Sequence, residues 1–283
     1  MPRTIDFQAV AKVLEQSARD GKSVAPILKR RCRAIARQIE ADAKVSEISR
    51  LWGQSINFDE IASKQIVDPQ IMLAICEMAG TSCSDEIVHA GLQHTYGYLF
   101  STISTPYGYK RDRWVKPDVE AGFQIKSPSI RPVPAQGTLL ANLTYFLGRI
   151  AFRGQSRELT LLRRLRGAVS SDVLGVPYRQ LKARRLVETV KLSARRTLFI
   201  QTDIVSYLTG TTSSPGDLLV YSLRLSNDPI GKLVTAFPVS EEIVRELTSE
   251  DSQGSKVAVR LRFNAHVDGL SRQPMIGQRS LQK

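Results

Sequence analysis

Two apolar runs separated by a strong turn constrain the fold of this chain more than any other stretch. The run Leu218 to Leu225 is rich in Leu, Val and Tyr, and the turn residues 227–231 (Asn-Asp-Pro-Ile-Gly) follow it closely. A second run, Lys232 to Val239, begins directly after that turn. Because apolar runs bounded by Asn, Asp, Pro and Gly are typical of paired strands, we expect residues 215–239 to form a β-hairpin.

The second strand of this hairpin carries a distinctive phrase. Its period of two places Leu233, Thr235 and Phe237 on one face, and Pro238, which lacks an N–H donor, belongs at a strand end or edge. The stretch Lys232 to Pro238 resembles the last catalytic strand of small metal-independent ribonucleases, the EndoU-type and related toxin ribonucleases. Those enzymes carry a Thr/Ser-x-Tyr/Phe-Pro phrase there, and Thr235 and Phe237 fall on it.

The resemblance implies that RNA is cut by its own 2′-hydroxyl group, giving a 2′,3′-cyclic phosphate without a metal or any other cofactor. Such chemistry requires a base, an acid and cations around the phosphorane. In this interpretation Thr235 bonds phosphate or base and Phe237 stacks. Order along the chain supplies the other roles: His94 as general base or acid, His89 or His266 as its partner, and Lys191 or Lys126 beside the phosphorane.

The charge of the chain favours a polyanionic partner. Forty Lys and Arg residues against 27 Asp and Glu give a net charge of +13. Nucleic acid or an anionic surface suits this balance, and we favour RNA over DNA. The alternative is that the charge serves only solubility. The hypothesis further requires that Thr235 and the surplus cations line a common open cleft of phosphate size.

The basic aromatic loop, residues 104–137, is the second candidate for nucleic-acid contact. Rings and cations alternate in it, and a single strand of nucleic acid needs both, since bases stack on rings while cations hold phosphates. The residues concerned are Tyr107, Tyr109, Lys110, Arg111, Arg113 and Trp114. A folded surface hairpin is an equal alternative, and a small-molecule pocket around Tyr96, Tyr98, Tyr107 and Tyr109 is a third.

Two further patterns leave other nucleic-acid functions open. Asp118, Glu120 and Lys126 resemble the acid pair and lysine of metal-dependent DNA nucleases. Residues 172–190 resemble a helix-turn-helix whose second helix presents Arg184 and Arg185, which is typical of a non-catalytic DNA- or RNA-binding regulator.

The sequence predicts an α+β fold, with a helical N-terminal half followed by an antiparallel sheet of four or more strands with flanking helices. We expect helices within 5–42, at 46–53, 68–78, 87–100 and 156–167, and strands at 197–207 and 256–267 beside the hairpin. The predicted division is a helical domain (1–103), the basic aromatic loop (104–137), an α+β domain (138–267) and a flexible basic tail (268–283).

Cysteine content and hydropathy predict a cytoplasmic protein. Cys32, Cys76 and Cys83 fit no disulfide framework, and the N-terminus lacks the apolar core of a secretory signal. The longest apolar run, Thr138 to Ile150, is interrupted by polar residues and falls short of the ~20 residues that a membrane span needs. We expect it to form a central buried helix. No membrane contact is predicted, and a homo-oligomer remains possible.

Overall fold

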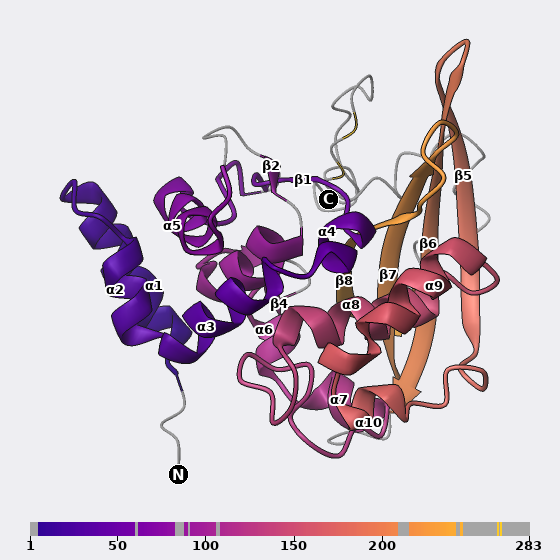
Figure 1. Cartoon of the computed structure of the whole chain (residues 1–283), viewed down its shortest axis with the longest axis horizontal. Helices are drawn as coiled ribbons and strands as arrows, with labels where there is room; N and C mark the ends of the chain where they lie inside the picture. The colour runs from indigo at the N-terminus through magenta and orange to yellow at the C-terminus, as the bar shows by residue number, and fades with distance from the viewer. Residues whose placement is uncertain are drawn as a thin grey trace.

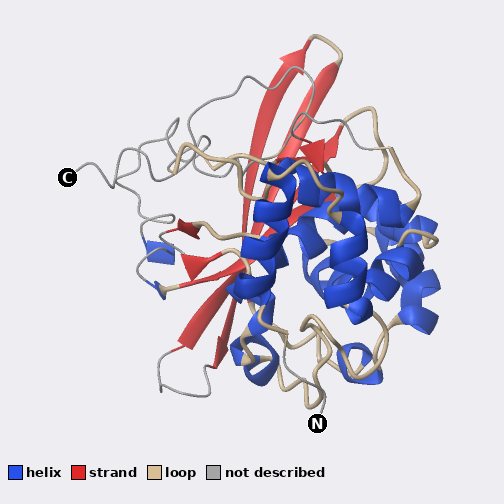
Figure 2. Cartoon of the chain, turned by 90° about the vertical axis from the view of Figure 1, so that its left-hand side faces the viewer, coloured by secondary structure: helices blue, strands red, loops and turns tan. Residues whose placement is uncertain are grey.

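The computed structural model describes residues 5–59, 62–82, 88–89, 91–105, 108–208, 215–241, 244–245, 265 and 267. It confirms the predicted α+β class, since a helical N-terminal region precedes a four-stranded antiparallel sheet. Figures 1 and 2 show the helices gathered against one face of that sheet.

The N-terminal region is built from short amphipathic helices. Two helices were expected within residues 5–42, but the structure has three, because the helical conformation is interrupted at Cys32. Asp68 caps a later helix by accepting the Gln70 N–H, and Gly80 ends it in the left-handed conformation. The bounds are α1 (Phe7–Arg19), α2 (Ala25–Arg31), α3 (Arg33–Asp42), α4 (Ser46–Leu51) and α5 (Pro69–Ala79).

Short elements connect this region to the sheet. They include β1 (Ser55–Ile56), β2 (Val88–His89), the π-helix η1 (Gln93–Gly97), the 3₁₀ helix η2 (Tyr98–Phe100), β3 (Ser104–Thr105), β4 (Gly108–Tyr109), α6 (Asp112–Val115) and α7 (Asp118–Gly122). After them come α8 (Leu139–Ala151), α9 (Ser156–Leu165), the 3₁₀ helix η3 (Arg166–Ala168) and α10 (Ser171–Leu174).

Helix α8 is the central buried helix that its apolar composition predicts. Every residue of α8 except Arg149 is buried. The helix contacts α4 and α9 on one side and the sheet on the other. The main apolar core is continuous from Phe7 to Ala236, so the helices and the sheet share one core across the predicted boundary at 104–137.

The sheet has the strand order β5-β6-β7-β8. Its strands are β5 (Ala183–Ser193), β6 (Arg196–Leu208), β7 (Pro215–Leu225) and β8 (Lys232–Val239). The predicted hairpin at 215–239 and the predicted strand at 197–207 are confirmed. The predicted strand at 256–267 lies outside the described residues apart from Ala265 and Val267, which pack on the sheet face opposite α8.

The predicted helix-turn-helix at 172–190 is wrong. Helix α10 is only four residues long, and Arg184 and Arg185 lie on strand β5 instead of a recognition helix. The alternation of Leu186, Val190 and Leu192 on one face explains the outcome, because this side-chain period of two suits a strand paired with β6.

A buried carboxyl group ties three helical segments together. Asp42 of α3 accepts hydrogen bonds from the hydroxyls of Tyr96 and Thr138, both at 2.5 Å. Burial raises the pKa of Asp42 to about 6, although the two hydroxyl donors act against that rise. The folded state therefore binds this proton more tightly than the unfolded chain does.

We predict that Asp42 makes stability fall as pH rises. Its folded pKa lies above the unfolded value, so its contribution is complete below about pH 4 and is lost as pH rises through about 6, by up to roughly 3 kcal/mol. Chemical unfolding of wild type and Asp42→Asn between pH 4 and 7 tests this. The stability of wild type relative to the variant should drop with pH, whereas Glu77→Gln, on the exposed side of α5, should show no comparable drop.

Candidate functional site

The candidate site forms where the π-helix η1 meets the edge strand β8. The predicted helix 87–100 is wrong at its start, because Val88 and His89 pair with β1 as strand β2. The helical part begins at Gly91, where an added Cβ would lie 2.9 Å from the Trp52 ring. Glycine therefore fits at this position without displacing the Trp52 ring, and the helical segment that begins here carries His94 into the interior.

His94 and Thr235 meet although they are 141 residues apart in the chain. The distance from His94 Nε2 to Thr235 Oγ1 is 3.2 Å, and Arg113 Nη1 donates to the same oxygen at 3.1 Å. Because Arg113 donates to Oγ1, the hydroxyl hydrogen of Thr235 is free to point at an unprotonated Nε2. The hydroxyl therefore couples an imidazole to a guanidinium group.

A β-bulge in β8 directs Thr235 to this position. Tyr221 pairs with Thr235 and Ser222 pairs with Leu233, which leaves Val234 as the extra residue. Leu233 consequently packs in the helix-facing core, while Thr235 and Phe237 both contact Arg113. The prediction that Leu233, Thr235 and Phe237 share one face is thus wrong for Leu233, because a bulge shifts the alternation.

The ring of Tyr98 is the floor of the site. His94 lies 4.2 Å from it between ring centroids, and the cationic groups of Lys110 and Arg113 each lie 5.7 Å from its centroid. Lys110 Nζ also pairs with an Asp59 carboxylate oxygen at 3.3 Å. Two cations, an imidazole and a hydroxyl are therefore held around one aromatic ring.

Burial changes the acidity of the two cations. It lowers the pKa of Lys110 to about 8, an effect that the charge of Arg113 reinforces and Asp59 opposes. It also lowers the pKa of Arg113 to about 10. Lys110 is consequently an ammonium group that can lose a proton close to neutral pH, which an exposed lysine does not do.

The site is closed in this structure. His94 is 6% exposed, Thr235 7%, Lys110 6%, Arg113 8% and Asp59 5%. The expectation that Thr235 lines an open cleft is therefore wrong. The expectation that cations converge on Thr235 holds for Arg113, which contacts it directly.

Other residues of the predicted aromatic and basic set have structural partners. Phe237 is 3% exposed and lies 4.9 Å below the Arg113 guanidinium, so its ring stacks on a cation of the protein. Trp114 is buried. Tyr109 is exposed and stacks with Arg111, which donates to the Ser101 carbonyl at 2.9 Å. Tyr107 and His266 lie outside the described residues, as does the side chain of His89.

The structure does not bring the predicted phosphorane lysines to Thr235. Lys191 lies on β5, and the two strands between β5 and β8 imply a separation of about 14 Å across the sheet. Lys126 is exposed on the loop after α7. Arg184 is exposed on β5, and Arg185 pairs with Asp203 at 2.8 Å. Arg113 and Lys110 are the cations that lie beside Thr235 and Tyr98.

The acids of the proposed metal-dependent nuclease do not form a site. Glu120 accepts the backbone N–H groups of Ser129 and Ile130 and pairs with Arg131 at 2.5 Å, so it holds a loop in place. Among the described residues, no three His, Cys, Asp or Glu side chains gather closely enough to hold a metal ion. No helix in the described part of the chain has the length and apolar character of a membrane span.

Tyr98 was expected only in a small-molecule pocket, although it follows His94 by four residues, a spacing that places side chains on one helical face. Asp59 is the member of the site that the sequence did not single out. Asp59 lies in a short irregular segment that carries no motif. Only its packing against Lys110 reveals it.

We predict energetic coupling between Arg113 and Thr235. Thr235→Val and Arg113→Met each remove the same buried hydrogen bond, so their effects on the free energy of unfolding should fall short of additivity by about 1 kcal/mol or more. Urea unfolding of the single and double variants measures this term. Thr235→Val combined with Lys44→Met, at an exposed position, should be additive, and additivity in the Arg113 pair would contradict the coupling.

The site is defined by the positions of its own side chains. Comparison of the chain with protein-family models, with curated proteins and with solved structures finds no match.

Proposed function

We propose that this protein is a metal-independent endoribonuclease whose site is the cluster of His94, Lys110, Arg113 and Thr235. The observation that supports it is the 3.2 Å contact between His94 and Thr235, two residues far apart in the chain that the sequence analysis expected in one site. The +13 charge of the chain supports a polyanionic substrate.

The cluster offers a group for each step of 2′-hydroxyl transphosphorylation. His94 Nε2 takes the proton of the RNA 2′-hydroxyl, and the resulting oxygen attacks the adjacent phosphorus. Lys110, protonated below about pH 8, donates a proton to the leaving 5′-oxygen as the phosphorus–oxygen bond breaks. The products are a 2′,3′-cyclic phosphate and a free 5′-hydroxyl end.

Arg113 and Thr235 suit the charge that develops in between. The guanidinium of Arg113 carries donors in a fixed plane, and it already touches Thr235 Oγ1 at 3.1 Å. A phosphate entering here would replace the Thr235 oxygen as acceptor for Arg113 and gain the Thr235 hydroxyl as a donor. Both interactions strengthen as the phosphorane gains charge.

The burial of these side chains sets a condition on this activity. A phosphate reaches residues that are less than a tenth exposed only after neighbouring segments move. Closure of a site strengthens the electrostatic interactions inside it, because water no longer screens them. The proposal therefore includes an opening step before substrate enters.

A non-catalytic RNA-binding protein is the second candidate. The same burial favours it, because a sealed network of His94, Arg113 and Thr235 also serves to hold η1, α6 and β8 together. In that case the basic surface alone would contact RNA.

We predict that the purified protein cuts single-stranded RNA in the presence of excess EDTA and leaves 2′,3′-cyclic phosphate ends. His94→Gln should slow cutting by about 100-fold or more, because it removes the base. Gel analysis of labelled RNA and mass spectrometry of the ends measure both. Lys44→Ala removes an exposed cation that is not part of the cluster and should cut at the wild-type rate. Retention of RNA without cutting would instead support the binding protein.

We also predict an alkaline decline in the cutting rate at saturating RNA. Lys110 acts as the acid only while protonated, so the rate should fall as pH rises above about 8. Lys110→Arg keeps its charge at higher pH but is too weak an acid to donate the proton, so it should cut more slowly than wild type and show no such decline. A wild-type rate that stays constant through the alkaline range would exclude Lys110 as the acid.

A further inference from the structure

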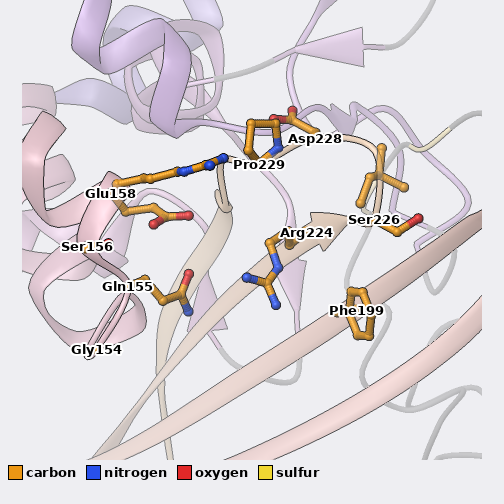
Figure 3. Close-up of a pocket in the computed structure, with 11 residues that line it drawn as sticks. Gly154, Gln155, Ser156, Glu158, Phe199, Arg224, Ser226, Asp228 and Pro229 are labelled. Atoms are coloured by element: carbon orange, nitrogen blue, oxygen red, sulfur yellow. The ribbon is translucent and has the colours of Figure 1, made fainter.

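A separate group of cations lies on the helix-facing side of the sheet, next to the start of α9. A pocket of about 600 Å³ opens there between the first turn of α9, strand β6 and the β7–β8 turn. Figure 3 shows the side chains of Arg224, Phe199 and Gln155 extending into this space. The volume is within the range of about 300–1,000 Å³ that small-molecule sites occupy.

An aromatic ring and an arginine form the wall of the pocket. Phe199 of β6 and Arg224 of β7 are direct cross-strand partners, and the guanidinium lies 5.5 Å from the ring centroid. Phe199 is half-buried and Arg224 is exposed. A partly exposed ring beside a cation on a sheet surface is the arrangement on which proteins stack unpaired bases.

The acids of the pocket are already paired within the protein. Glu158 accepts the Gly231 N–H at 2.6 Å. Asp228 accepts the Ile230 N–H at 2.9 Å and pairs with Lys232 at 3.6 Å. The acidic groups are therefore held in place by the turn, and Lys232 offsets part of the charge of Asp228, so the arginines of the pocket must outweigh the charge of Glu158 when an anion binds.

Further cations lie on the same side of the sheet as the Phe199 ring. Arg157, in the first turn of α9, is an exposed residue of the pocket lining. Lys191 pairs with Thr197, two residues from Phe199 on β6, so it lies on the face that carries Phe199. With Arg224 these residues give the pocket the charge that a phosphate backbone requires.

We propose that this pocket binds one nucleotide of a single-stranded RNA, with the base stacked on Phe199 and the adjoining phosphates held by Arg157, Arg224 and Lys191. This inference rests on the proposed function for the choice of RNA as ligand. Single-stranded RNA is favoured over a duplex because only an unpaired base exposes its face to a ring.

The pocket is an anchoring subsite separate from the cleavage cluster. Tyr221 is the β7 partner of Thr235, and Arg224 follows it by three residues, which is about 10 Å along the strand. The side chains also lie on opposite faces. Phe199 and Arg224 line the pocket beside α9, whereas Tyr221, the partner of Thr235, belongs to the apolar core on the other face. RNA held here would be bound away from the bond that is cut.

Binding of a 12-nucleotide 2′-O-methyl RNA tests the subsite, because this oligonucleotide lacks the attacking hydroxyl and cannot be cut. Fluorescence anisotropy at low salt should show that Phe199→Leu, which keeps an apolar side chain but removes the π-face, weakens binding about tenfold. Phe199→Trp should retain the affinity. Arg224→Ala should weaken binding and reduce its salt dependence, whereas Arg179→Ala, an exposed arginine outside the pocket, should lower affinity less.

The outcomes separate this inference from the proposed function. Binding that depends on Phe199, in a protein that does not cut RNA, would keep the subsite and reject the nuclease. Equal binding by Phe199→Leu and wild type, with both variants folded by thermal unfolding, would overturn the subsite whether or not RNA is cut. Equal or tighter binding of a 2′-O-methyl duplex, or no binding of either probe, would overturn it too.

Discussion

The hydroxyl of Thr235 is one of the polar contacts that join the helical region to the sheet, beside the Gly53 N–H, which donates to the Leu233 carbonyl at 2.6 Å. The Thr235 hydroxyl meets His94 from the helical region and Arg113 from the segment between the helices and the sheet. Water is nearly excluded there, so each of these contacts is stronger than it would be at the surface, and each is costly to leave unsatisfied. This shared oxygen helps to hold β8 against η1 and α6.

A single inserted residue makes that contact possible. Without the bulge at Val234, regular alternation would place Leu233 and Thr235 on the same face of β8. The bulge allows Leu233 to pack in the core that includes α8 while Thr235 turns to the opposite side. Bulges are frequent beside functional sites for this reason, since they redirect one side chain without disturbing the rest of the sheet.

Burial gives the cluster its chemical character and also closes it. Removal of water lowers the pKa values of Lys110 and Arg113. Both cations lie over the Tyr98 ring, whose π-electrons partly replace the lost solvation. The Phe199 pocket is the opposite case, because it is open and its cations remain in water. Under the proposed function, the open pocket on one face of the sheet serves attachment of RNA and the closed cluster on the other face serves the chemistry.

Elements with a local signal could be predicted from the sequence. The hairpin at 215–239, the apolar helix α8 and the capped helix α5 each follow from side-chain period, turn residues or caps within a few positions. The sequence also singled out His94 and Thr235 as members of one site. The period of two in β5 was a local signal as well, although the helix-turn-helix prediction missed it. Contacts between distant segments were different, because Arg113, Lys110 and Asp59 joined the cluster through packing that no sequence spacing encodes. Local sequence sets backbone preference, whereas the burial of polar groups is fixed only when segments far apart in the chain pack together.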